Sequence, residues 1–337
     1  MHSSRRLGVI FSLLVSLQIG LFSAEVVAQD LASETVVSSA EDASIEAASS
    51  EGIIAASGSD DARISTGLGP KPDPLPMPTW SSEWGQPGAV GLGVTGILGI
   101  SAAAINLGVD PIAVPNWRGP VLADGFVHER LRASTPQGRE LAATTSDVLV
   151  GTLVVAPLLI EPVLLRLKSD DWSVAGRMAA INAQSMAVAL FATTALKFTV
   201  GRARPPLDAC WDQPDENCED REALSFPSGH TSMAFAGASL VCLNHEMMSP
   251  LGGPWDDIAC YSALSAATTA GVMRMIAHKH YMSDVLAGAA IGVISGYFLP
   301  KWLYFGFEGS SGLLAKHNVM VTPSVGELNG IKVGFTW

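Results

Sequence analysis

The sequence predicts an all-α protein, a bundle of about six apolar helices that is followed by a short C-terminal β-hairpin. Apolar residues make up 48% of the 337 residues and charged residues only 15%, so there is ample material for a buried core. From Gly88 onward, Ala/Gly-rich apolar segments recur, each long enough for a helix. These segments lie at about 88–109, 147–167, 177–199, 230–246, 258–277 and 285–305.

The first 28 residues have the organisation of a secretory signal peptide. Arg5 and Arg6 precede an uncharged apolar run, and a small residue, Ala28, offers a cleavage site. An uncleaved membrane anchor is the alternative, but the polar Ser/Ala-rich chain that follows favours cleavage. In either case we expect the rest of the chain to be exported, as a periplasmic protein that is soluble or attached to the membrane.

A tether is predicted for residues 29–87, because its first part is rich in Ser, Ala, Glu and Asp without a sustained period and its last part is rich in Pro. Residues 29–73 hold nine acidic and two basic residues, which accounts for −7 of the net charge of −12. This balance does not suggest nucleic acid as a partner. The expected domains are therefore 1–28, 29–87, a helical domain at 88–310 and a tail at 311–337.

The apolar segments leave the relation to the membrane open. Some approach the ~20 residues of a membrane span, but the third carries Asn182 and Gln184. The four arginines between 110 and 145 favour a cytosolic loop there, which would also place the loop at 200–229 inside. A disulfide between Cys210 and Cys218, which flank a short polar stretch of that loop, is not expected in the cytosol. Either fewer than six segments span the membrane, or the bundle is a soluble periplasmic domain. We slightly favour the soluble domain.

The other two cysteines and the C-terminus complete the structural expectations. Cys242 and Cys260 lie in apolar segments, where buried thiols are expected and a helix-to-helix bridge remains open. Val319–Val325 and Ile331–Trp337 resemble strands, and Asn329-Gly330 is a favoured two-residue hairpin turn.

The first of three clusters that carry chemistry lies where the third apolar segment ends. Lys197 and Arg204 are seven residues apart, about two helical turns, so they can share one face before Pro205 and Pro206 stop the helix. Two fixed cations suit a phosphoryl group, because Arg offers a planar fork and Lys a point charge. Ordinary basic residues at a helix end are the alternative interpretation.

The second cluster, Phe226-Pro227-Ser228-Gly229-His230-Thr231, opens the fourth apolar segment. Ser228 is a natural N-cap, and Gly229 lets backbone amides approach a ligand. A helix start of this kind binds anions, and His230 at its rim can pass a proton. A plain cap with an incidental histidine is the alternative.

The third cluster runs from Arg274 to Asp284. Asp284 follows His280 by four residues, so its carboxylate can hold the imidazole and leave the other ring nitrogen as a nucleophile or base. Arg274 adds a third cation. A His–Asp pair that only packs is one alternative; a zinc site with His278 is another, disfavoured because the surrounding cations, with Lys279 among them, would repel a metal ion.

In this order and spacing, the clusters resemble the type 2 phosphatidic acid phosphatase (PAP2) family, which includes bacterial non-specific acid phosphatases and shares its site with vanadium haloperoxidases. The family pattern of Lys, six residues, Arg-Pro, then Pro-Ser-Gly-His, then Ser-Arg, five residues, His, three residues, Asp covers roughly residues 177–300. It falls on Lys197, Arg204, Pro205, Pro227, Ser228, Gly229, His230, Arg274, His280 and Asp284. The family's Ser before Arg274 is replaced by Met273, which removes a hydroxyl but no charge.

The resemblance implies an α-helical bundle with the site at one end and a metal-independent phosphatase without a cofactor. His280 would attack phosphorus, oriented by Asp284, and His230 would protonate the leaving oxygen. Lys197, Arg204, Arg274 and the amides near Ser228 and Gly229 would hold the phosphoryl oxygens, and vanadate would inhibit.

The implied substrates are phosphomonoesters or lipid phosphates and diphosphates. A vanadate-dependent haloperoxidase, with vanadate as its cofactor, and a catalytically degenerate envelope protein of the same fold are the alternatives; Met273 keeps the second open.

Overall fold

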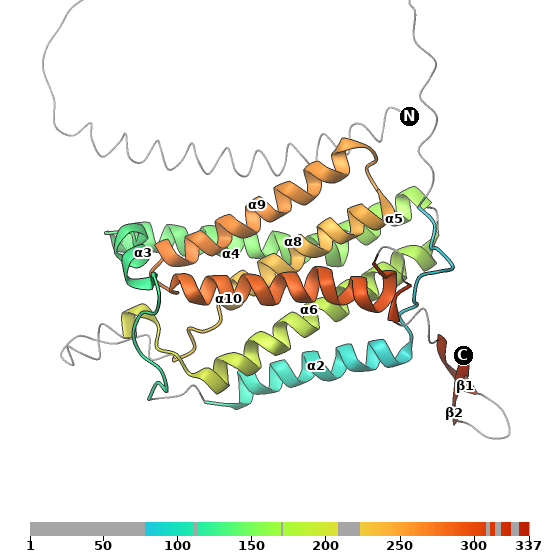
Figure 1. Ribbon diagram of the computed structural model, residues 1–337, viewed down its shortest axis with the longest axis horizontal. Coiled ribbons are helices and arrows are strands. Elements are labelled where there is room, and N and C mark those ends of the chain that lie inside the picture. Colours follow the sequence, from blue (N-terminus) through green and yellow to red (C-terminus); the bar gives the residue numbers. More distant parts are fainter. Residues whose placement is uncertain are drawn as a thin grey trace, which may run out of the picture. The chain divides into compact units, whose positions relative to one another are not determined.

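The protein is described by a computed structural model, which covers residues 78–110, 114–169, 171–207, 223–307, 311–313, 318–324 and 330–336. The predicted signal peptide and most of the predicted tether lie outside these residues. Figure 1 shows long helices packed side by side, so the predicted all-α bundle is confirmed. Its helices are α2 (Ala89–Gly108), α3 (Asp124–Leu131), α4 (Pro136–Val155), α5 (Glu161–Ser169), α6 (Trp172–Val200), α8 (Gly229–Met248), α9 (Pro254–Ile276) and α10 (Met282–Val293).

Short π-helical turns extend two of the helices. The turn η1 (Ala156–Ile160) joins α4 to α5, while η2 (Ile294–Phe298) and η3 (Lys301–Phe305) follow α10. Two features of the bundle were not expected from the sequence. Helix α3 lies in the stretch that was interpreted as a loop, and α4 begins eleven residues before the predicted segment. The side chain of Thr135 caps α4 by accepting a hydrogen bond from the Gly138 amide, and Pro136 occupies its first position.

Helix α8 lies at the centre of the bundle, where it contacts α4, α6, α9 and α10. Glycines allow the closest of these contacts. A Cβ at Gly292 of α10 would lie 2.5 Å from the carbonyl oxygen of Ser232, and one at Gly237 of α8 would lie 2.0 Å from that of Leu153. The backbones therefore approach more closely than any larger residue would permit.

A disulfide joins α8 to α9. It connects Cys242 with Cys260, with an S–S distance of 2.01 Å. The expectation of buried thiols at these positions was wrong, because the two helices bring both cysteines face to face. Cys210 and Cys218 lie outside the described residues, so their pairing stays a prediction.

Within the described residues, four helical stretches are long and apolar enough to cross a membrane: Ala89–Gly108, Pro136–Ser169, Trp172–Val200 and Met282–Phe305. On α2, Ile97, Ile100 and Leu107 are 66%, 72% and 89% exposed. The polar Asn182 is instead fully buried and donates to the carbonyl oxygen of Pro157, so it does not weaken the apolar outer surface. These features favour membrane association over the soluble bundle that the sequence slightly favoured.

Two strands follow the helices, β1 (Asn318–Ser324) and β2 (Gly330–Thr336), and they pair antiparallel. Ser324 pairs with Gly330, so Gly330 is a strand residue and not part of a two-residue turn.

Candidate active site

The three sequence clusters meet at one end of the bundle. Helices α6 and α9 end there and α8 and α10 begin there, on the left in Figure 1. The ammonium nitrogen of Lys197 lies 3.2 Å from where a Cβ of Gly229 would be. A fixed positive charge from α6 thereby adjoins the start of α8.

Arg204 reaches the site by a different route from the one expected. Helix α6 ends at Val200, and Gly201 takes the left-handed conformation at φ 57°. Arg204 is therefore not on the helical face of Lys197. The positive charges of Lys197 and Arg204 nevertheless both disfavour protonation of His280, which indicates that both side chains lie near it.

His280 is a buried, neutral imidazole. It lies in the turn before α10, 1% exposed, and burial lowers its pKa to about 3 against the opposing effect of Asp284, with Arg204 and Lys197 lowering it further. An imidazole that is to attack phosphorus must be unprotonated, and this surrounding keeps it so at neutral pH.

The predicted contact between His280 and Asp284 is longer than a hydrogen bond. Nδ1 of His280 lies 3.7 Å from Oδ2 of Asp284. The carboxylate is instead saturated by Arg202, Ser225 and the Tyr281 amide, which donate to it over 2.7, 2.6 and 2.9 Å. Asp284 is close enough to orient the imidazole, and such bonds commonly shorten when substrate binds.

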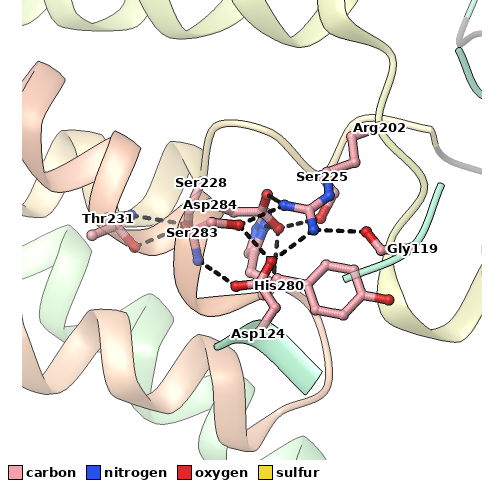
Figure 2. Close-up of polar contacts among 10 residues, drawn as sticks. Gly119, Asp124, Arg202, Ser225, Ser228, Thr231, His280, Ser283 and Asp284 are labelled. Atoms are coloured by element: carbon pink, nitrogen blue, oxygen red, sulfur yellow. Dashed lines mark hydrogen bonds and ion pairs between the residues drawn. The ribbon is translucent and has the colours of Figure 1, made fainter. Parts of the chain in front are cut away.

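Arg202, which the sequence reasoning missed, is the hub of this arrangement (Figure 2). Fully buried, its guanidinium donates to Asp284, Asp124, Ser283 and the carbonyl of Gly119 over 2.7–2.9 Å. It also stacks 4.2 Å from the ring centre of Trp117. Its presence in the first cluster, between Lys197 and Arg204, was the available signal, but its carboxylate partners are distant in sequence.

Asp147 of α4 is the second missed residue. Its Oδ1 lies 2.8 Å from Nε2 of His230 and 3.3 Å from Nη1 of Arg274. Burial and Arg274 lower the pKa of His230 to about 4, with Lys197 adding to the effect and Asp147 opposing it. Nothing in the local sequence around Asp147 marked it, since its partners come from α8 and α9.

Ser228 has a more structural place than expected. Its side chain caps α8, accepting from Thr231, as predicted. Its amide donates to the carbonyl oxygen of Asp284 over 2.9 Å, so in this structure that amide is engaged in holding α8 against α10 instead of facing an anion.

The surroundings of His278 bear on the zinc alternative. His278 stacks on His128 with ring centres 4.7 Å apart, and its backbone is left-handed at φ 60°. Over the described part of the chain, no three His, Cys, Asp or Glu side chains are grouped so as to hold a metal ion.

Residues 179–307 match the family model described as the PAP2 superfamily. This match supports assignment of residues 179–307 to the PAP2 superfamily. The matched residues include Lys197, Arg204, Gly229, His230 and the third cluster, so the resemblance seen in the motifs is confirmed at the level of the domain.

Among similar proteins, the lipid A 1-phosphatase of Porphyromonas gingivalis is 34% identical over 136 residues, which are 40% of this chain and 25% of that protein. A PA-phosphatase related-family protein of Dictyostelium discoideum is 29% identical over 121 residues, 34% of this chain and 45% of that protein. The chain thus spans less than half the length of these curated relatives.

A crystal structure of a transmembrane PAP2-type phosphatidylglycerolphosphate phosphatase from Bacillus subtilis is similar with a TM-score of 0.43 and 17% identity, covering 63% of this chain and 94% of that one.

Proposed function

We propose that this protein is a metal-independent lipid phosphatase that forms a phosphohistidine on His280. One observation carries the proposal: the neutral, buried His280 lies at the end of the bundle where Lys197, Arg204 and Arg274 gather beside a second histidine, His230. Three cations match the charge of a phosphoryl group, and a positioned nucleophile and proton donor supply the remaining chemistry.

The proposed reaction has two steps. Nε2 of His280, the ring nitrogen directed away from Asp284, attacks phosphorus while the bond to the leaving oxygen breaks and His230 gives that oxygen a proton. Water, deprotonated by His230, then attacks the phosphohistidine and releases inorganic phosphate with His280 restored. Lys197, Arg204 and Arg274 stabilise the charge on the phosphoryl oxygens in both steps.

Lipid substrates are favoured by the position of the site. The candidate spans Trp172–Val200 and Met282–Phe305 end and begin at the site, so in a membrane the site would lie at the level of lipid headgroups. A relative is named for lipid A, a lipid phosphate. The disulfide between Cys242 and Cys260 supports export to an oxidising compartment, and we propose that the site faces the periplasm.

Hydrolysis by the purified full chain tests the proposal. In detergent with EDTA, phosphatidate and p-nitrophenyl phosphate are expected to release phosphate, vanadate should inhibit, and His280→Ala should abolish turnover. Asp257→Asn, an exposed position in the first turn of α9, is the matched control. Release that requires added metal, or that survives in His280→Ala, would contradict the proposal.

A further inference from the structure

Asp147 is a carboxylate that lies among the cations around His230. It lies on α4 with its side chain 57% exposed, and one oxygen contacts both His230 and Arg274. The neighbouring Ser146 is fully buried and donates to the carbonyl oxygen of Ala270 over 3.1 Å, which holds α4 against α9 at this level. Helix packing therefore fixes the place of Asp147 opposite the start of α8.

The charges around His230 come from three helices. Arg274 of α9 and Lys197 of α6 both disfavour its protonated form, in addition to burial, while Asp147 of α4 favours it. A histidine that gives a proton to a leaving oxygen must first carry that proton. Of these three side chains, Asp147 is the one that stabilises the protonated imidazole.

We infer that Asp147 is the positioning residue for proton transfer to the leaving group, holding the imidazole of His230 through Nε2 and leaving Nδ1 to face the leaving oxygen. The site then contains two carboxylate–imidazole pairs. Asp284 orients His280 for its attack on phosphorus, and Asp147 orients His230 for protonation of the leaving oxygen. The inference rests on the proposed function and adds a residue that the three sequence clusters do not contain.

The dependence on the leaving group separates this role from simple phosphate binding. A nitrophenolate leaves as a stable anion and needs little help from an acid, whereas the alkoxide of a glycerolipid must be protonated as it departs. A residue that acts through His230 therefore matters for alkyl esters and much less for aryl esters. A residue that acts on phosphate binding affects both alike.

The experiment compares the full chain and its Asp147→Asn variant in one detergent with EDTA, on dioctanoyl phosphatidate and on p-nitrophenyl phosphate. We expect kcat for the phosphatidate to fall about 10- to 100-fold, and kcat for the aryl ester to change less than about 3-fold, because proton transfer contributes about 10²–10⁴ in such reactions. Asp147→Glu should recover part of the loss, and Asp257→Asn should match the wild type.

The pH profile gives a second readout. Asp147 raises the pKa of His230, so its removal lowers that pKa and reduces the protonated fraction at every pH. The decline of kcat/KM for phosphatidate with rising pH should therefore move to lower pH in Asp147→Asn. In a His230→Ala background, Asp147→Asn should cause no further loss, since the partner through which it acts is absent.

Three results would overturn the inference while leaving the proposed function intact: equal losses on both esters, a lower KM with unchanged kcat, or additive losses with His230→Ala. The second would mean that Asp147 only competes with the phosphoryl group for Arg274. A wild-type chain that hydrolyses neither ester would overturn the proposed function and the inference together.

Discussion

Nη1 of Arg202 lies 2.7 Å from Oδ1 of Asp284, and both side chains are completely buried. Its other terminal nitrogen lies 2.8 Å from Asp124 at the start of α3. One guanidinium thus joins α3, the turn after α6 and the first turn of α10, directly behind His280. This ion triad therefore supports the turn that holds His280, the proposed nucleophile.

Removing Arg202 should affect both stability and catalysis. Arg202→Met leaves Asp124 and Asp284 buried without a counter-charge, so we expect a loss of about 3–5 kcal/mol in the free energy of unfolding and a large fall in kcat. Arg202→Lys keeps the charge but not the fork, so stability should partly recover while kcat stays low. Thermal unfolding in detergent and kcat measure both effects.

Arg177 provides the matched control for Arg202. It lies near the start of α6 and stacks over Trp80 at 5.5 Å, so Arg177→Met should leave kcat unchanged. Arg202→Met with wild-type unfolding temperature and kcat would show that the buried triad has neither role.

Arg274→Ala should weaken anion binding. Arg274 is 6% exposed and, although burial lowers its pKa to about 10, it stays charged at neutral pH. The loss of a charge-assisted hydrogen bond of about 1.5–3 kcal/mol should raise the inhibition constants of phosphate and vanadate about 10- to 150-fold. Unchanged vanadate inhibition would exclude contact between Arg274 and the phosphoryl oxygens.

Gly292→Ala should force α8 and α10 apart. Its Cβ would lie 2.5 Å from the Ser232 carbonyl oxygen and 2.6 Å from Cβ of Phe235, so we expect about 1–3 kcal/mol of destabilisation. Gly99→Ala on α2, where a Cβ meets nothing within 4 Å, is the control and should unfold at the wild-type temperature or above it. Equal unfolding temperatures for the two variants would refute the close packing.

The disulfide between Cys242 and Cys260 should stabilise the folded protein. Cys242 and Cys260 close a loop of 18 residues, for which a stabilisation of about 3 kcal/mol is typical. Cys242→Ala with Cys260→Ala should therefore lower the unfolding temperature. Mass spectrometry of the non-reduced exported protein should find the two cysteines linked, and free thiols at both would contradict the bridge.

The sequence predicted most of the long helices, because apolar segments are encoded locally. The apolar composition placed six segments, and the spacing within each cluster indicated Lys197, His230 and His280 as candidate site residues. It did not predict that Gly201 ends α6, so that Arg204 reaches the site from a turn, or that α4 begins at Pro136 behind the Thr135 cap.

Long-range partners could not be predicted in the same way. Arg202 meets Asp124 and Asp284 from 78 and 82 residues away, and Asp147 meets Arg274 from 127 residues away. No periodicity or short motif encodes such pairs, because they depend on how α3, α4 and α9 pack.

Trapping of the phosphoenzyme tests the central claim most directly. The full chain in detergent with EDTA is mixed briefly with ³²P-labelled phosphatidate, quenched in alkali, in which phosphohistidine survives, and mapped by mass spectrometry, with His280→Ala and Asp257→Asn in parallel. The account predicts a label on His280 that is lost in acid, retained in Asp257→Asn and absent from His280→Ala. Phosphatidate turnover without any label on His280, or with equal label in His280→Ala, would contradict it.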